Sequence, residues 1–241
     1  MLVHGLNMKP SKMDALAKLL RSSHINTLRV ALTGHRGDPT ELQSVTRKKW
    51  LQDFADAYAD IEARALKENA PQHFIGFSLG GTLVHDFLLE RSDAHFDRMV
   101  LLAPAIALTR RATLIRLLEL LRPLGHLMIP SLSHPLYQAN AGTSIAAYNA
   151  LLDSYHRIHR KHFRASNIPT LVVTDPEDEL VNADGIDHLI AHNSLNRWTT
   201  MRVTHARNTL RLKYHHLITD PDALGEEEWE RVASAIQNHL L

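Results

Sequence analysis

The sequence predicts an α/β fold with a mostly parallel sheet flanked by helices. Short apolar segments alternate with amphipathic segments over residues 1–103, and the alternation returns after residue 167. This order is typical of parallel strands joined by crossover helices that cover both faces of a sheet. Residues 105–166 lack the alternation and are apolar. We expect them to form a small helical cap over the mouth of the sheet, inserted into a core of residues 1–104 and 167–241.

The first half of the core is predicted from periodicity and from turn residues. Over residues 10–22, the apolar residues recur at helical spacing, which predicts a helix. A second, long helix begins near Thr46, and Pro71 ends it. A glycine-bearing loop at 33–39 ends the second strand. The expected elements are strand 1–3, helix 10–22, strand 25–32, helix 46–69, a strand after Pro71, a helix from Thr82 and strand 98–103.

The second half of the core begins with the apolar segment 168–174. The expected elements here are strand 168–174, helix 183–192, strand 198–203 and a final helix over 226–240. With 241 residues, the chain is long enough for one α/β domain with a large core and one insertion.

Composition excludes several classes of function. The net charge is +1 with scattered basic residues, so no basic tract indicates nucleic-acid binding. Cysteine is absent, which excludes disulfides, thiolate metal sites and a cysteine nucleophile. Neither an apolar run of about 20 residues nor a secretory signal pattern is found, so we expect a cytoplasmic protein without an integral membrane segment.

The most informative motif is Gly76-x-Ser78-x-Gly80. It follows a short apolar strand and precedes a helix with an apolar face. This is the context of a nucleophile elbow, in which a sharp turn presents a serine between small neighbours. The start of the helix then directs amide groups toward an anion beside the serine. We therefore expect Ser78 to be a nucleophile.

A serine nucleophile needs a base, and the base needs an acid that orients it. The acid is expected just beyond strand 168–174, where Asp178 precedes the apolar Val181. We favour Asp178, with Asp175 of the same loop as the alternative. The base should lie between the last strand and the last helix. We favour His216, because an apolar pair and then an acidic residue follow it; His215 and His205 are the alternatives.

Acyl transfer also needs two backbone donors for the oxyanion. One is expected to be the amide of Leu79, directly after the nucleophile. The other should come from the loop after the first strand, where we favour the amide of Leu6 over that of Asn7. His4 is expected to brace this loop.

Together these motifs resemble the α/β-hydrolase superfamily. The resemblance rests on His4-Gly5, Gly76-Phe77-Ser78-Leu79-Gly80-Gly81, Asp178 and His216-Leu217-Ile218-Thr219, and it spans nearly the whole chain. It is strongest toward small bacterial carboxylesterases and monoacylglycerol-lipase-like serine hydrolases with a short helical cap. Three features depart from the family pattern: its usual first two strands are not found, Asp175 replaces a glycine, and Thr33-Gly34-His35-Arg36-Gly37 only roughly matches the usual Pro-Gly-His-Gly loop.

The resemblance implies a serine hydrolase that cleaves carboxylic esters of small molecules through an acyl-enzyme. We expect short-to-medium acyl chains, because a cap of residues 105–166 encloses limited space. Such a mechanism requires neither a metal nor an organic cofactor. The alternatives are a thioesterase, an amidase or a C–C bond hydrolase with the same triad, or a non-catalytic binding member of the fold. An intact triad argues against the last of these.

Two further patterns lie in the expected cap. Leu114, Leu117, Leu118 and Leu121 form an apolar stretch that we expect to line an acyl pocket; a membrane-surface helix and plain core packing are the alternatives. His156, His159 and His162 recur every three residues among basic side chains. A zinc pair on a helix prefers a spacing of four, so we interpret this pattern as a solvated basic face and expect no metal there.

Overall fold

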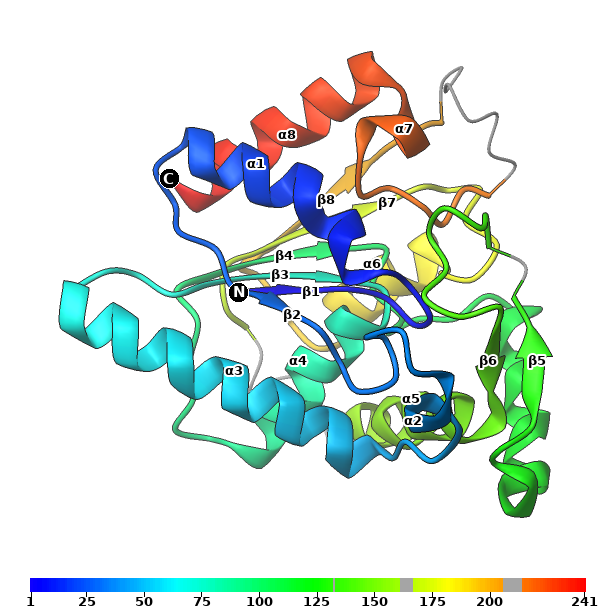
Figure 1. Cartoon of the computed structure of the whole chain (residues 1–241). Helices are drawn as coiled ribbons and strands as arrows, with labels where there is room; N and C mark the ends of the chain where they lie inside the picture. Colours follow the sequence, from blue (N-terminus) through cyan, green and yellow to red (C-terminus); the bar gives the residue numbers. More distant parts are fainter. Residues whose placement is uncertain (132, 161–166, 206–213) are drawn as a thin grey trace.

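The computed structural model describes residues 1–131, 133–160, 167–205 and 214–241. Within these ranges, six parallel strands form one sheet in the order β2-β1-β3-β4-β7-β8 (Figure 1). The predicted α/β class is therefore confirmed. The strands of this sheet are β1 (Leu2–Val3), β2 (Arg29–Val30), β3 (His73–Phe77), β4 (Arg98–Leu102), β7 (Thr170–Thr174) and β8 (Trp198–Arg202).

Helices cover both faces of the sheet. In Figure 1, α1 and α8 lie on one face, and α3 and α4 lie on the other. The core helices are α1 (Asp14–Ser22, after the 3₁₀ turn η1 at Pro10–Met13), α2 (Pro39–Gln43), α3 (Arg47–Glu68), α4 (Leu79–Glu90), α6 (Ala183–His192), α7 (Pro221–Leu224) and α8 (Glu226–Leu240).

The ends of α3 show why its bounds could be predicted. The side chain of Thr46 accepts a hydrogen bond from the amide of Lys49 and so caps the first turn. Asn69 ends the helix in the left-handed conformation, with φ of 49°, and Pro71 follows. Between these ends, Trp50, Phe54 and Tyr58 are fully buried on one face of the helix.

Helix α4 is the central helix of the fold, because every residue from Leu79 to Leu88 is buried. Its Phe87 ring lies 4.8 Å from that of Phe54, which joins α4 to α3. Burial of this many apolar groups holds the start of α4, and with it the turn at Ser78, in a fixed position.

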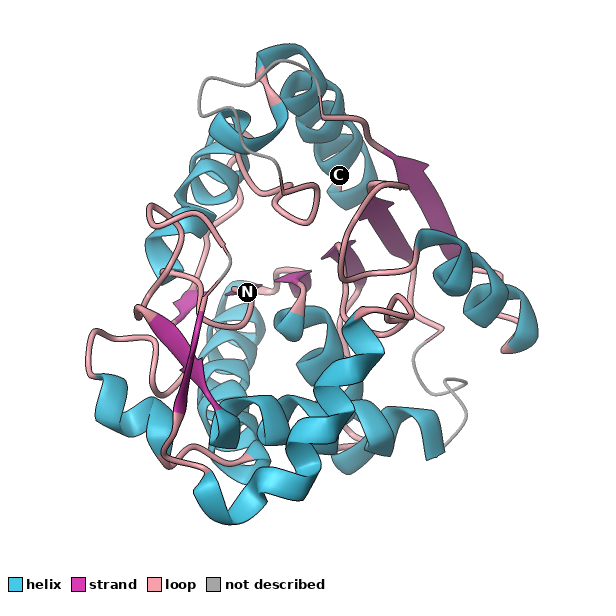
Figure 2. Ribbon diagram, turned by 90° about the vertical axis from the view of Figure 1, so that its right-hand side faces the viewer, coloured by secondary structure: helices cyan, strands magenta, loops and turns pink. Residues whose placement is uncertain are grey.

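The cap differs in part from the predicted helical insertion. It contains the 3₁₀ segment η2 (Ala112–Leu124), which is interrupted by non-helical angles at Leu121, and α5 (Ile145–Arg160). It also contains a two-stranded antiparallel sheet of β5 (Met128–Pro130) and β6 (Gly142–Ser144). The pairing joins residues far apart in sequence, so local periodicity did not indicate it. Figure 2 looks toward the carboxyl ends of the parallel strands, with β5 and β6 beside that end.

Other differences concern short elements. The predicted strand 25–32 is reduced to Arg29–Val30, because its ladder partner β1 has only two residues. Helices α2 and α7 were not predicted. Each is a single turn whose preceding residue, Asp38 or Asp220, caps it with its side chain. Within the described ranges, no helix combines the length and apolar character needed to cross a membrane.

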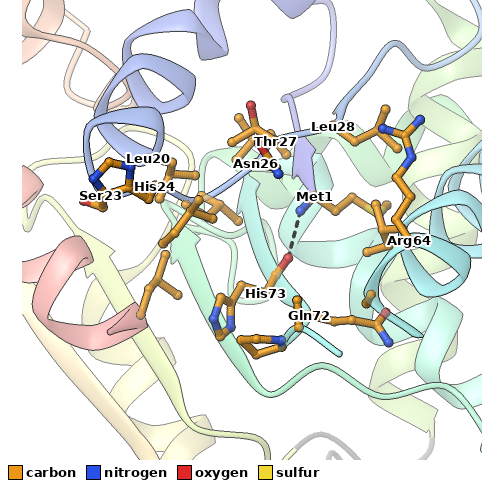
Figure 3. A pocket seen from close by; sticks show the side chains of 18 of the residues that line it. Met1, Leu20, Ser23, His24, Asn26, Thr27, Leu28, Arg64, Gln72 and His73 are labelled. Carbon is orange, nitrogen blue, oxygen red and sulfur yellow. Dashed lines mark hydrogen bonds between the residues drawn. The ribbon is translucent and has the colours of Figure 1, made fainter. Parts of the chain in front are cut away.

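A cavity of about 440 Å³ lies at the amino ends of the parallel strands, beside the two chain termini. Figure 3 shows the ammonium group of Met1 donating to the carbonyl of His73 at 2.8 Å. Burial lowers the pKa of this ammonium to about 5. Ser78 follows the carboxyl end of β3, so this cavity lies at the opposite end of the sheet from it.

Candidate active site

Ser78 occupies a sharp turn between β3 and α4. Its backbone angles are φ 48° and ψ −107°, which a residue with a side chain rarely adopts. The turn brings chain segments very close together: a Cβ atom at Gly80 would lie 2.5 Å from the carbonyl oxygen of Val3. Only glycine fits at position 80, which explains the spacing of the sequence motif.

The structure brings His216 to Ser78 and Asp178 to His216. Nε2 of His216 lies 2.9 Å from Oγ of Ser78, and Nδ1 lies 2.8 Å from Oδ2 of Asp178. Since the carboxylate only accepts, Nδ1–H donates to it, and Nε2 is left to accept from the serine hydroxyl. All three residues are buried. This is the arrangement that activates a serine.

Asp178 is held in place by its own loop. Its other carboxylate oxygen accepts hydrogen bonds from the amides of Leu180 at 2.7 Å and Val181 at 2.9 Å. The ring of Phe77 packs near His216, with 5.0 Å between the ring centroids. The carboxylate and the imidazole are therefore both oriented before any substrate binds.

The alternative acid and the alternative bases meet elsewhere. Oδ2 of Asp175 lies 2.6 Å from Nδ1 of His205 and 3.1 Å from Nδ1 of His215. Burial lowers the pKa of His205, but its hydrogen bonds to Asp175 and to the carbonyl of Leu217 outweigh that effect and raise the pKa above its usual value. Burial raises the pKa of Asp175, yet hydrogen bonds from both histidines and from the amide of Glu177 bring it below its usual value.

The loop after β1 approaches Ser78 closely. A Cβ atom at Gly5 would lie 3.2 Å from Cβ of Ser78. The hydrogen bond from the amide of Met8 to the carbonyl of Gly5 closes a turn, and the amides of Leu6 and Asn7 take no part in that bond. The amide of Asn7 donates to Nε2 of His35 at 2.8 Å, so it is already engaged. Leu79 opens α4, where the first amides have no acceptor within the helix.

Two buried histidines brace this loop. Nδ1 of His4 donates to the carbonyl of Gly5 at 2.8 Å, while Nε2 accepts from the amide of Leu32 at 3.2 Å. Burial lowers the pKa of His4 to about 4. The pKa of His35 is also well below its usual value, chiefly because of burial and then because His4 is close. Both rings are therefore neutral near pH 7.

The cap is joined to the core beside the site by residues that the sequence analysis did not single out. Oδ1 of Asn7 accepts from the amide of Asn140 at 2.8 Å, and Nδ2 of Asn140 donates to the carbonyl of Gly34 at 2.8 Å. The hydroxyl of Tyr137 donates to Asp220 at 2.6 Å. The Asn7–Asn140 pair is separated by 133 residues and the Tyr137–Asp220 pair by 83. No local sequence pattern links residues so far apart, so the sequence analysis could not find these contacts.

The four predicted acyl-pocket leucines lie along η2, and three of them are exposed. The exposed fractions are 64% for Leu114, 62% for Leu117 and 40% for Leu121, whereas Leu118 is half-buried. η2 packs against α5. These leucines are therefore not part of a closed pocket in this structure, and their contact with an acyl chain stays a prediction.

The histidines of α5 make separate contacts. Nε2 of His156 lies 3.1 Å from Glu119, and Nε2 of His159 donates to the carbonyl of Ile106 at 2.8 Å. His162 lies outside the described residues. Among the residues that the structure describes, the group of His, Asp and Glu side chains that could hold a metal ion is Asp175, His205 and His215.

The fold and the serine turn define an α/β-hydrolase, and solved structures agree. The chain is similar to the monoglyceride lipase of Saccharomyces cerevisiae, with a TM-score of 0.75, 11% identity and coverage of 99% of this chain and 84% of that one. It is also similar to a structure from the metagenome-derived lipolytic enzymes LipS and LipT, with a TM-score of 0.72, 20% identity and coverage of 99% and 92%. The monoacylglycerol lipase of Paleococcus ferrophilus is similar with a TM-score of 0.62 and 18% identity, and the match covers 99% of this chain and 93% of that one. These identities show a shared fold.

The family follows from the sequence match. Residues 1–155 match the family described as Serine aminopeptidase, S33, so the chain belongs to that family. The matched region includes the turn at Ser78 and the loop after β1. No curated protein matches the sequence significantly.

Proposed function

We propose that this protein is a serine hydrolase that cleaves carboxylic esters through an acyl-enzyme. The observation that carries the proposal is the continuous hydrogen-bonded series from Ser78 through His216 to Asp178, with separations of 2.9 Å and 2.8 Å. Solved relatives named as lipases and monoacylglycerol lipases support ester cleavage rather than another use of the fold.

In the proposed acylation step, Nε2 of His216 takes the hydroxyl proton as Oγ of Ser78 attacks the ester carbonyl carbon. Asp178 orients the imidazole and stabilises its charged form. The amides of Leu6 and Leu79 donate to the oxyanion that develops, and the positive end of α4 adds to this stabilisation. When the tetrahedral intermediate collapses, the alkoxide leaves with the proton from Nε2.

Deacylation repeats the chemistry with water. His216 takes a proton from a water molecule, whose oxygen attacks the acyl carbonyl carbon of modified Ser78. The same two amides stabilise the second oxyanion. Collapse releases the carboxylic acid, and Nε2 returns its proton to Oγ. Every step uses only side chains and amides of this chain together with water.

We further propose that the substrates are small-molecule esters with short-to-medium acyl chains. A cap that spans residues 105–166 encloses limited space, and it is tied to the core beside Ser78 through Asn7 and Asn140. We propose that the acyl chain extends from Ser78 toward the cap and contacts the η2 leucines. Each methylene removed from water contributes about 0.8 kcal/mol, or roughly fourfold in specificity.

The family description makes an aminopeptidase the second candidate. Such an enzyme would use the same serine chemistry on an amide, and it would need a carboxylate near Ser78 to bind the α-ammonium group of the substrate. Asp178 is committed to His216 and to two amides, so it is not free for that role. This engagement favours the ester.

The experiment combines covalent labelling with a substrate panel. Purified protein is treated with a fluorophosphonate probe, and the modified residue is mapped by mass spectrometry. Turnover is then measured on p-nitrophenyl esters of increasing acyl length and on aminoacyl p-nitroanilides. Labelling at Ser78 with ester turnover supports the proposal. Labelling with turnover of anilides alone would make it a peptidase, and failure to label would reject the serine mechanism.

A further inference from the structure

A second group of chemically active side chains lies close to the candidate active site but outside it. We name Asp175, His205 and His215 the Asp175 cluster. Asp175 follows β7, His205 lies beyond β8, and His215 directly precedes His216. One ligand atom from each residue lies within 4.8 Å of the other two. None of the three has a role in the proposed ester hydrolysis.

The hydrogen bonds of His205 orient it as a metal ligand. Its Nε2 lies 2.8 Å from the carbonyl oxygen of Leu217, and a carbonyl can only accept, so Nε2 carries the hydrogen. In the neutral ring, the lone pair is then on Nδ1, which points at Oδ2 of Asp175 from 2.6 Å. Two lone pairs at that distance require a proton or a metal cation between them. Donation of the other ring N–H to a carbonyl is typical of histidines that bind metals.

His215 approaches the same oxygen in the same manner. Its Nδ1 lies 3.1 Å from Oδ2 of Asp175, and its Nε2 lies 3.5 Å from a carboxylate oxygen of Glu177. That carboxylate favours the hydrogen on Nε2, which again leaves the lone pair on Nδ1. The amide of Glu177 fixes the other oxygen of Asp175 at 2.7 Å. Two imidazole nitrogens and one carboxylate oxygen thus converge.

Burial and charge favour a cation at this point. The side chains of Asp175 and His205 are only 2% and 4% exposed, whereas that of His215 is 29% exposed and borders solvent. Four acidic residues occur within positions 175–179, and the pair of amides at His215 and His216 is bound by Glu179. A cation would therefore enter from the solvent side into a negatively charged loop.

The spacing of the ligand atoms suits a tetrahedral ion. Zinc binds imidazole nitrogen and carboxylate oxygen at about 2.0–2.2 Å, which places neighbouring ligand atoms roughly 3.3 Å apart. The two separations from Oδ2 of Asp175, 2.6 Å and 3.1 Å, are both shorter than that value, so the two histidines would move slightly away from Asp175 when an ion binds. The third separation is at most 4.8 Å. Imidazole and carboxylate ligands without thiolate suit Zn²⁺ and similar divalent ions.

We propose that Asp175, His205 and His215 bind one divalent transition-metal ion of the zinc class, through Oδ2 of Asp175 and Nδ1 of each histidine, with water completing the shell. The ion would join the loop after β7 to the segment before His216. Its role would be structural, because Asp175 lies after β7 whereas both histidines lie in the connection between β8 and α7, and the ion would hold these two segments together. The binding does not depend on whether the chain hydrolyses esters.

The test measures metal binding directly. The untagged full chain is stripped with a chelator and titrated with Zn²⁺ against a chromophoric competitor, and Co²⁺ is used to record the visible absorption of a tetrahedral site. We compare the wild-type chain with Asp175→Asn and with His215→Gln. His156→Gln is the matched control, since it also removes a histidine paired with a carboxylate.

The expected result is one Zn²⁺ per wild-type chain, tetrahedral Co²⁺ absorption, and a Tm that rises on Zn²⁺ addition. Each cluster variant should bind at least about 100-fold more weakly, because even loss of an outer contact of a metal ligand costs 10–100-fold. His156→Gln should match the wild type, and so should Ser78→Ala, which separates this proposal from the ester hydrolase proposal.

The proposal is overturned if the wild-type chain binds no Zn²⁺, because a proton then joins Asp175 to His205. It is equally overturned if His215→Gln keeps wild-type affinity or if His156→Gln loses it. His215 is partly exposed, so its replacement by Gln is expected to fold, and near-UV circular dichroism verifies this for each variant.

Discussion

His216 contacts Asp178 rather than Asp175, although the two carboxylates are only three residues apart. Nδ1 of His216 lies 2.8 Å from Asp178, while Asp175 lies within hydrogen-bonding distance of His205 and His215. One loop therefore supplies one carboxylate to His216 and another to His205 and His215. His216 belongs to the proposed active site, and the other two histidines belong to the proposed metal site.

The Asp178→Asn variant should lose turnover by about 10⁴-fold, because an amide cannot hold His216 in the required tautomer or stabilise its charged form. Asp175→Asn should lose far less, since Asp175 does not contact His216. Initial rates on p-nitrophenyl butyrate compare the two variants. The reverse ranking would move the orienting acid to Asp175.

Replacement of the nucleophile is the direct test of the mechanism. Ser78→Ala should reduce ester turnover by about a million-fold, as in triads whose nucleophile is removed, and should abolish fluorophosphonate labelling. The change is small and the fold should persist, which thermal unfolding verifies. More than a few per cent of residual activity in a pure sample would be incompatible with Ser78 as the nucleophile.

Gly80→Ala should destabilise the protein, because the added methyl would lie 2.5 Å from the backbone oxygen of Val3, which has little room to move. Overpacking of this kind costs about 1–3 kcal/mol, and here it should also displace the turn at Ser78 and reduce activity. Urea unfolding measures the effect. Gly125→Ala is the control, since Gly125 has helical angles and a Cβ there would meet its nearest neighbour at 3.3 Å. Equal stability of the two variants would contradict this account.

Acid should weaken the fold partly through His4. Burial lowers its pKa to about 4 from the usual 6.5, so between these pH values the unfolded chain binds more protons than the folded chain. The contribution of His4 to the free energy of unfolding should therefore be complete above pH 6.5, and it should be lost progressively as the pH decreases toward 4. The contribution of one such group is about 1.4 kcal/mol per pH unit and about 3 kcal/mol in total.

The measurement is the urea midpoint of unfolding between pH 7.5 and pH 4.5. His4→Asn keeps a donor near the carbonyl of Gly5 but does not titrate, so its stability should depend less steeply on pH even if it is lower throughout. His24→Asn is the control, because His24 is exposed and Asn tolerates its φ of 59°. An unchanged slope in His4→Asn would show that His4 does not cause the acid sensitivity.

The η2 leucines provide a test of acyl selectivity. Leu117→Asp should depress the specificity constant for longer acyl esters more than for acetate, because a charge would oppose burial of the chain at about fourfold per methylene. Leu117 is 62% exposed, so the substitution should leave the stability of the protein nearly unchanged. Specificity constants across the ester series check this. A chain-length profile that is the same in both proteins would show that η2 does not contact the acyl group.

The sequence alone determined the class of fold, the turn at Ser78 and the bounds of helices such as α6 and α8, which match the prediction. These features are encoded locally. Gly76 and Gly80 lie within two residues of Ser78, and an amphipathic helix shows its period within its own length. The family pattern indicated the loops of His216 and Asp178 for the same reason, since chain order constrains which loop follows which strand.

Only the tertiary structure decided which side chains in those loops meet. Ser78 and His216 are 138 residues apart, and the competing pairs of Asp175 with His205 and His215 are separated by 30 and 40. Chain order narrowed the 17 histidines to three candidates. In a loop, however, neither helical nor strand period sets the direction of a side chain, so the sequence did not show which acid each candidate contacts. The β5–β6 pairing and the Asn7–Asn140 contact depend on the same long-range packing, because the chain forms them only after the sheet has brought distant segments together.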